Sequence, residues 1–283
     1  IASSYKEDLL LDTYSGAVGA FSVTRYLKKE FIGKAVVQLR RDSDGATADF
    51  NPTEITDGTA TSWAGMGQSA RVNVWYDQSG NGNDISQSSL YSKPYLIMSG
   101  TVQTLDGSRA AIDFDGTNDV IWIDSVFPDI VLNSISVFCV AKYDTTPTTP
   151  SECLYSLGWT AGSGRFFMQN WSSSGYEYGY YFGYAGTWDA AQGGPTADTS
   201  KHLFSSIAGS TQGTFEAWVD TTSMGSATLS SNTTSGTYGL GGVNSTTSYA
   251  FDGKMSEFIL YQSDQSAVRL SIKGNINTSY ALY

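Results

Sequence analysis

Trp75-Tyr76-Asp77-Gln78-Ser79-Gly80-Asn81-Gly82-Asn83-Asp84 gives the strongest indication of the fold in this 283-residue chain. It closes a short run, residues 71–76, in which apolar and polar side chains alternate as they do in a half-buried strand. Glycine takes positive φ without steric cost, and Asn and Asp side chains bond their own backbone in turns. The stretch therefore predicts a strand that ends in a stiff loop crowded with side-chain oxygens.

The same loop has the ligand spacing with which a calcium loop begins. Asp77, Ser79 and Asn81 occupy positions 1, 3 and 5, and Gly82 occupies position 6. The twelfth position is Ser88, so the bidentate glutamate of a complete calcium loop is missing. We expect a turn held by side-chain hydrogen bonds, with calcium at these three residues as the alternative and no other cofactor.

Composition excludes several kinds of partner. The net charge is −11, with only 16 Lys and Arg, which argues against nucleic acid and anionic membranes because their phosphates attract basic surfaces. No apolar run approaches the ~18 residues of a membrane span. A chain rich in Ser, Thr, Gly, Asn and Tyr is typical of a virion or extracellular surface, where we place it. It begins with Ile1 rather than Met, so we expect upstream residues to have been removed or left out.

Short apolar runs separated by polar turns predict an all-β fold, a sandwich or a barrel. We expect strands at residues 35–40 and 72–76 and, from residue 95 onward, near residues 109–114, 120–124, 134–142, 153–158, 165–170, 176–184, 202–208, 214–220, 237–241 and 254–261. Residues 51–70 look irregular.

Two segments are predicted to be helical. An apolar stripe predicts a short N-terminal helix over residues 17–31, and residues 266–276 predict another. We divide the chain into a lead-in segment, residues 1–13, and a single domain, residues 14–283. Cys139 and Cys153, the only cysteines, are expected to be buried free thiols, with a disulfide between hairpin neighbours as the alternative.

Five motifs stand out along the chain: residues 19–25, 35–46, 75–84, 111–119 and 251–261. Together they resemble concanavalin A-like jelly rolls of the laminin-G type, which implies a β-sandwich of two antiparallel sheets. The front half is also similar to the catalytic domain of fungal α-L-arabinofuranosidases of glycoside hydrolase family 54, and to modules of phage structural and tail proteins and of bacterial surface proteins.

The chain departs from the arabinofuranosidases at their active site. Those enzymes hold substrate with a disulfide between adjacent cysteines, and their nucleophile follows shortly after that pair. This chain has no Cys-Cys pair and no segment that aligns with the one carrying the nucleophile. The resemblance therefore transfers no catalytic residue.

No pair of carboxylates stands out for glycoside hydrolysis, which uses two of them about 5 to 9 Å apart. Glu177 is isolated between two tyrosines. Glu216 and Asp220 lie on one predicted strand, about 13 Å apart at strand spacing, which is too wide. Asp113, Asp115 and Asp119 fall in a glycine turn, where Asp side chains usually cap the backbone. Glu177 and Glu216 remain the only catalytic candidates.

An aromatic belt is the best candidate for a binding surface. Residues 166–188 contain ten aromatic residues, several of them at period two, so one strand face is aromatic. Such a face packs into the core or contacts glycan or protein, because Tyr and Trp rings are apolar with a polar edge. For contact with a glycan or a partner we select Trp171, Tyr176, Tyr178, Tyr181 and Trp188.

These observations favour a non-catalytic, lectin-like recognition or docking module on the surface of a virion, such as a phage fibre, tail or capsid decoration. Its expected partners are a glycan or host-surface receptor and other virion subunits, including copies of itself. The alternatives are a glycoside hydrolase related to the α-L-arabinofuranosidases and a purely structural assembly protein.

Overall fold

The computed structural model describes residues 8–122, 134–146, 152–157, 165–171, 177–184, 187–191, 193–209, 214–227, 238–242 and 249–283. Residues 165–171, 177, 180–184 and 187–190 are described by their backbone alone. Within these residues no helix is long and apolar enough to cross a membrane.

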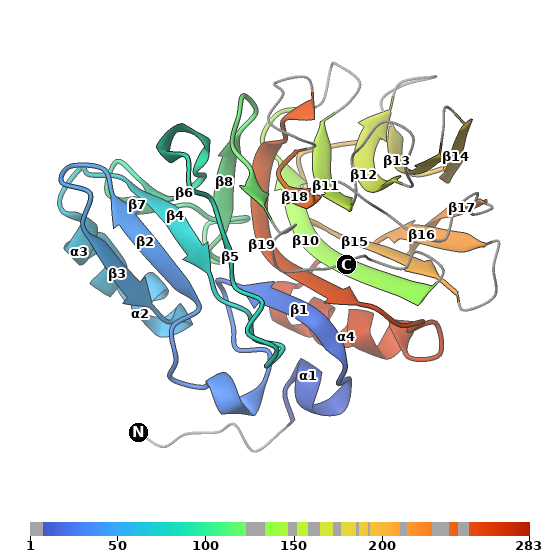
Figure 1. Ribbon diagram of the computed structural model, residues 1–283, viewed down its shortest axis with the longest axis horizontal. Coiled ribbons are helices and arrows are strands. Elements are labelled where there is room, and N and C mark those ends of the chain that lie inside the picture. Colours follow the sequence, from blue (N-terminus) through green and yellow to red (C-terminus); the bar gives the residue numbers. More distant parts are fainter. Residues whose placement is uncertain are drawn as a thin grey trace.

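One long strand organises the fold. β19 (Asp252–Tyr261) pairs with β10 (Ile135–Tyr143) along one edge and with β1 (Ala17–Ser22) and β8 (Ile112–Asp115) along the other. The run continues from β10 through β15 (His202–Ala208), β16 (Phe215–Val219) and β17 (Thr222–Ala227). All these pairings are antiparallel, so the all-β prediction is confirmed (Figure 1).

A second run of antiparallel strands lies against the first. It connects β9 (Ile121–Trp122), β18 (Tyr238–Leu240), β11 (Cys153–Leu157), β12 (Arg165–Trp171), β13 (Glu177–Tyr184) and β14 (Thr187–Ala191). Aromatic rings fill the space between the runs: the Tyr155 ring lies 5.3 Å from that of Phe258, and the Tyr178 ring lies 5.1 Å from that of Phe204. These contacts bury four large side chains and make one continuous core.

The front half of the chain extends beyond β8. β2 (Val37–Arg41), β3 (Thr47–Phe50), β4 (Ala70–Trp75), β5 (Ile85–Ser86), β6 (Tyr95–Met98) and β7 (Thr101–Val102) form this extension, on the side of β19 away from β11–β14 (Figure 1). Two short helices, α2 (Pro52–Thr56) and α3 (Thr59–Ala64), occupy the segment predicted to be irregular. Asn51 starts α2, because its side chain accepts hydrogen bonds from the N–H groups of Thr53 and Glu54.

The predicted helix over residues 17–31 is wrong. β1 begins at Ala17, and only a short 3₁₀ turn, Lys29–Phe31, is helical in that range. Five of the six β1 residues are buried, because one face packs on the main core and the other on the helix side. A strand buried on both faces shows no alternation. The N-terminal helix is α1 (Leu10–Thr13), and α4 (Arg269–Tyr280) confirms the predicted C-terminal helix.

Both cysteines are free and buried, as expected. Burial raises the pKa of each thiol well above its ordinary value, so both behave as small apolar side chains.

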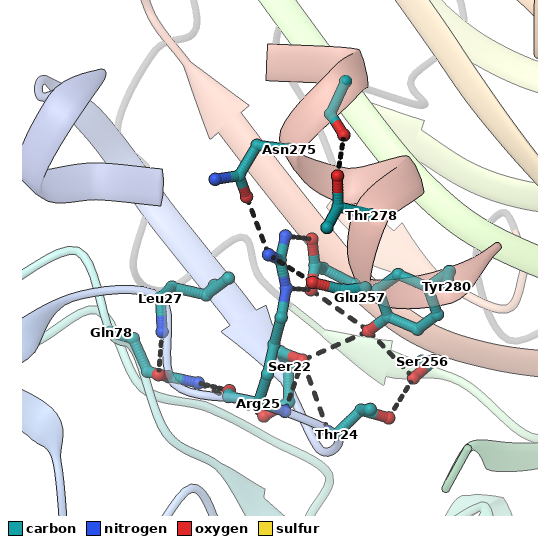
Figure 2. Close-up of polar contacts among 12 residues, drawn as sticks. Ser22, Thr24, Arg25, Leu27, Gln78, Ser256, Glu257, Asn275, Thr278 and Tyr280 are labelled. Carbon is teal, nitrogen blue, oxygen red and sulfur yellow. Dashed lines mark hydrogen bonds and ion pairs between the residues drawn. The ribbon is translucent and has the colours of Figure 1, made fainter. Parts of the chain in front are cut away.

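A buried ion pair joins the helix side to the sheet. Arg25 donates from Nε and from Nη2 to the two oxygens of Glu257, both at 2.7 Å, and the Glu257 side chain is 1% exposed. The third nitrogen, Nη1, donates to Asn275 at 2.8 Å and to Ser279 at 2.9 Å, both on α4 (Figure 2). Burial lowers the pKa of Arg25, but the Glu257 carboxylate more than offsets it and the pKa is raised.

Replacing Arg25 by Ala should lower the free energy of unfolding by about 3–5 kcal/mol, because it leaves the Glu257 charge buried without a partner. The measurement is urea denaturation followed by tryptophan fluorescence. Lys29→Ala is the control, since Lys29 pairs with Asp8 at the surface, where ion pairs contribute little. A double variant, Arg25→Met with Glu257→Leu, should recover most of the loss. A single variant as stable as the control would contradict this account.

Candidate active site

Charged side chains gather on one face where β8 meets the start of β19. Asp113 is opposite Lys254, and Asp115 is opposite Asp252, in the register of the two strands. Directly paired residues point to the same side of a sheet. Lys254 Nζ lies 3.1 Å from Asp113 and also contacts Asp144, at the end of β10. Lys254 therefore neutralises part of the negative charge that Asp113, Asp115, Asp144 and Asp252 bring to this edge of the sheet.

Glu152 and Asp252 form the pair with the most suitable electrostatics for acid catalysis. Glu152 directly precedes β11, Asp252 begins β19, and both side chains are half-buried. The pKa of Glu152 is raised to about 7, and burial is the main cause. The hydrogen bond from the Asp252 backbone lowers this pKa, and the negative charge of Asp252 raises it. Asp252 Oδ2 accepts a hydrogen bond from Thr145 at 3.1 Å. A carboxyl group that keeps its proton near pH 7 beside a second carboxylate is the arrangement of a general acid.

Asp119 is a third carboxyl group at this end of the molecule. Its side chain is 2% exposed, its Oδ2 accepts from the Asp115 N–H at 3.2 Å, and its Oδ1 has no hydrogen-bond partner among the described residues. Burial and the Asp115 charge raise its pKa to about 7. Gly241 lies between Asp119 and β11: its N–H donates to the Leu154 carbonyl, and a Cβ there would lie 3.1 Å from the Asp119 carbonyl oxygen.

Asp115 has the capping role expected of its turn. Its Oδ1 accepts hydrogen bonds from the N–H groups of Thr117 and Asn118, at 2.8 and 3.1 Å. Asp113 instead pairs with Lys254 across the strands. Of the three, only Asp119 has a buried side-chain oxygen without a hydrogen bond inside the described part of the molecule.

The carboxylates selected from the sequence lie elsewhere. Glu216 is exposed on β16, separated from β19 by β15 and β10. Asp220, its candidate partner, follows β16 and bonds His202 Nδ1 at 2.6 Å. Glu177 begins β13, but its side chain is outside the described residues. Sequence patterns do not pair Glu152 with Asp252, because 100 positions separate them. The only local signal for either residue is its place next to an apolar strand run.

One of the five selected aromatic residues belongs to the core. Tyr178 is fully buried, its hydroxyl donates to the Asp198 carbonyl at 3.2 Å, and its ring stacks on that of Tyr143. It cannot contact a glycan, which corrects the expectation for this residue. The backbones of Trp171, Tyr181 and Trp188 lie in β12, β13 and β14, but their side chains fall outside the described residues, as does all of Tyr176.

The loop at Asp77 is a hydrogen-bonded turn. Asp77 accepts from the N–H groups of Ala20, Ser79 and Asn83, at 2.8 to 3.1 Å, and from the Ser79 hydroxyl at 2.6 Å. Asn81 donates to Ser79 and to the Ala17 carbonyl. No group of three or more His, Cys, Asp or Glu side chains within the described ranges is placed to hold a metal. Calcium at Asp77, Ser79 and Asn81 stays a prediction, and binding it would displace these bonds.

The chain is similar to α-L-arabinofuranosidases, both in a family model and in solved structures. The family model of the catalytic domain of α-L-arabinofuranosidase B matches residues 8–118. An arabinofuranosidase complexed with arabinofuranosyl-α-1,2-xylobiose superposes with a TM-score of 0.69 at 17% identity, covering 93% of this chain and 62% of its own. A GH54 α-L-arabinofuranosidase soaked with a cyclic sulfate inhibitor superposes with a TM-score of 0.70 at 17% identity, covering 93% of this chain and 63% of its own. No curated protein sequence matches the chain.

The chain therefore has the fold of an arabinofuranosidase glycoside hydrolase, and spans about 62% of the length of these enzymes. The similarity of its front half to the family 54 catalytic domain is confirmed. The expectation of a non-catalytic, lectin-like virion module is wrong, because the family match and the structural matches support the glycoside hydrolase alternative. The similarity to phage modules is not confirmed.

The raised pKa of Glu152 can be measured directly. Carbon-13 NMR of protein labelled at the glutamate carboxyl carbon should show one group that titrates near pH 7, and Glu152→Gln should remove that signal. Asp252→Asn should lower the pKa of Glu152, since it removes the neighbouring negative charge but keeps the backbone N–H. Titration of Glu152 in the ordinary range for glutamate would contradict the site.

Proposed function

We propose that this chain is the catalytic domain of a glycoside hydrolase that removes arabinofuranosyl groups from glycans, with Glu152 as proton donor and Asp252 as its carboxylate partner. The observation that carries the proposal is the half-buried carboxyl group of Glu152, whose pKa burial raises to about 7, next to Asp252 in a chain that superposes on an arabinofuranosidase over 93% of its length. We also infer that residues 14–283 form a single concanavalin A-like jelly-roll sandwich that acts outside the cell.

Each residue has a defined task in the proposed reaction. Glu152 transfers its proton to the glycosidic oxygen as the bond from the anomeric carbon to that oxygen breaks. The Asp252 carboxylate stabilises the positive charge that develops on the sugar ring. Water then supplies the hydroxyl group of the released sugar, and its remaining proton restores Glu152. Lys254 remains paired with Asp113 and Asp144 and does not neutralise Asp252.

The substrate must be held differently from the way family 54 enzymes hold it. The chain has no adjacent cysteines, and Cys139 and Cys153 are buried as free thiols. Contacts with the sugar therefore have to come from polar and aromatic side chains. For this reason we assign the reaction to arabinofuranosyl glycosides as a class and not to one linkage.

Glu152→Gln should reduce hydrolysis by 100-fold or more, in line with the usual contribution of a general acid. The loss should be greater for an arabinofuranosyl oligosaccharide than for 4-nitrophenyl α-L-arabinofuranoside, because nitrophenolate departs with little help from an acid. Asp252→Asn should lower the rate with both substrates. Release of nitrophenol and of arabinose measures the two rates.

Two matched variants separate this assignment from its competitors. Glu216→Gln makes the same chemical change at an exposed site and should leave the rate unchanged. Glu177→Gln tests the other candidate from the sequence. If Glu177→Gln abolishes turnover and Glu152→Gln does not, the assignment of the acid is wrong. If the unmodified chain cleaves no arabinofuranoside or other glycoside, the proposed function fails.

The rate should fall as the pH rises through about 7. The folded-state pKa of Glu152 is raised to about 7, so Glu152 holds its proton below that pH and loses it above. An acid catalyst works only in its protonated form, so kcat/KM should fall tenfold for each pH unit above the pKa. Asp252→Asn should shift this fall in kcat/KM to lower pH. A profile that stays flat from pH 6 to 9 would contradict the role of Glu152.

A further inference from the structure

A second feature of interest lies away from Glu152 and Asp252, at the glycine loop of residues 77–84. A surface pocket of about 360 Å³ is formed by the 3₁₀ turn, β3, the end of β4 and the glycine loop that follows. β3, which supplies Asp49, and β4, which ends just before Tyr76, lie on the side of β19 away from β11 (Figure 1). Its lining residues are Glu30, Phe31, Lys34, Ala35, Asp49, Tyr76, Asp77, Gly80, Gly82 and Asp84.

Two aromatic rings and three exposed carboxylates give the pocket its chemistry. The rings of Phe31 and Tyr76 are half-exposed, while Glu30, Asp49 and Asp84 are exposed. The Tyr76 hydroxyl donates to Asp49 Oδ1 at 2.8 Å, and Gln38 donates to the same oxygen at 2.9 Å. Asp49 is thus fixed in place through one oxygen, and its Oδ2 has no hydrogen bond among the described residues.

The other two carboxylates are held in the same way. Asp84 Oδ1 accepts from the Asp77 N–H at 2.8 Å, and Glu30 Oε2 lies 3.0 Å from Lys28 Nζ. Each has its second oxygen available to accept a hydrogen bond from a ligand.

The wall of the pocket is stiff before any ligand binds. Gly80 and Gly82 have φ of +97° and +73°, and a Cβ at Gly80 would lie 2.9 Å from Lys28 Nζ. The loop is fixed from behind, where Asn83 donates to the Val18 carbonyl at 2.7 Å and Asp77 accepts from the Ala20 N–H. Little conformational freedom is left to lose when a ligand binds, and preformed sites gain affinity for that reason.

The charge of the lining selects the kind of ligand. Four carboxylates and one ammonium group line the pocket, so an anion is repelled. A metal ion in this pocket would have to displace the hydrogen bonds that both oxygens of Asp77 already accept. A neutral polyol fits, since its hydroxyl groups donate to carboxylates and its C–H surface packs on aromatic rings. The volume is at the low end for ligand pockets, which indicates a short saccharide.

We propose that this pocket is a second saccharide-binding site, for a short neutral segment of a glycan, separate from Glu152 and Asp252. Asp49 accepts hydrogen bonds from the sugar hydroxyls, and Tyr76 supplies the ring on which the sugar packs. Such a site lets the protein hold a polysaccharide at one point while the chemistry occurs at another. The proposal does not depend on the assignment of the catalytic acid.

The test measures binding in the Glu152→Gln variant, so that no sugar is consumed. Arabinotriose, xylotriose and maltotriose are titrated into nitrogen-15-labelled protein, with trigalacturonic acid as the charged control. At least one neutral trisaccharide should shift the amide signals of Gly80 and Gly82, and the acidic one should not. Asp49→Asn should weaken that binding tenfold or more, and Tyr76→Ala should abolish it. Asp57→Asn, at an exposed turn away from the pocket, should have no effect.

Melting temperatures establish that the variants are folded before their affinities are compared. The proposal is overturned if no neutral trisaccharide shifts Gly80 and Gly82, or if Asp49→Asn binds as tightly as its parent. The outcome is independent of the hydrolysis assay. Shifts at the glycines in a chain without hydrolytic activity would support the pocket alone, whereas hydrolysis without such shifts would support the catalytic site alone.

Discussion

The buried ion pair between Arg25 and Glu257 connects the sheet, the C-terminal helix and the turn after β1. Two charges removed from water need each other, because either one alone would be buried without compensation. Tyr280 donates to Glu257 at 3.1 Å, so the C-terminal helix completes the environment of the pair. On the other side, Gln78 donates to the Arg25 carbonyl at 3.3 Å and accepts from the Leu27 N–H at 2.9 Å. One interaction thereby fixes β19, α4 and the glycine loop relative to each other.

β19 links this constraint to the candidate active site. Glu257 and Asp252 lie on the same strand. Glu257 is surrounded by hydrogen-bond donors, whereas Asp252 is the half-buried first residue of the strand. Because β19 pairs with three neighbouring strands, its first residue is positioned by the whole sheet. The same sheet supports β10, whose end carries Asp144. A carboxylate at the start of such a strand is held more rigidly than one on an isolated loop, as catalysis requires.

Local patterns in the sequence predict strands well and the site poorly. The prediction for residues 202–208 matches β15 to the residue, because its ends are marked by polar turns. The prediction for residues 17–31 failed because β1 is buried on both faces and its apolar residues imitate a helical stripe. Glu152 and Asp252 come together only when β11 and β19 take their places in the fold, and a pattern within one segment cannot report that. Tyr178 was misjudged because its hydroxyl finds a backbone partner at Asp198, which lets a tyrosine lie in the core.

The fold and the proposed chemistry of this protein involve different residues. Neither the glycine loop nor the Arg25–Glu257 pair is part of the proposed catalytic pair, Glu152 and Asp252. Similarity of fold alone therefore does not establish an activity. For the proposed reaction the pKa of Glu152 matters most, because a glutamate with its ordinary pKa is ionised at pH 7 and cannot donate a proton. Burial, together with the charge of Asp252, raises the pKa of Glu152 to about 7, so this pair supports the proposed acid catalysis more directly than the fold does.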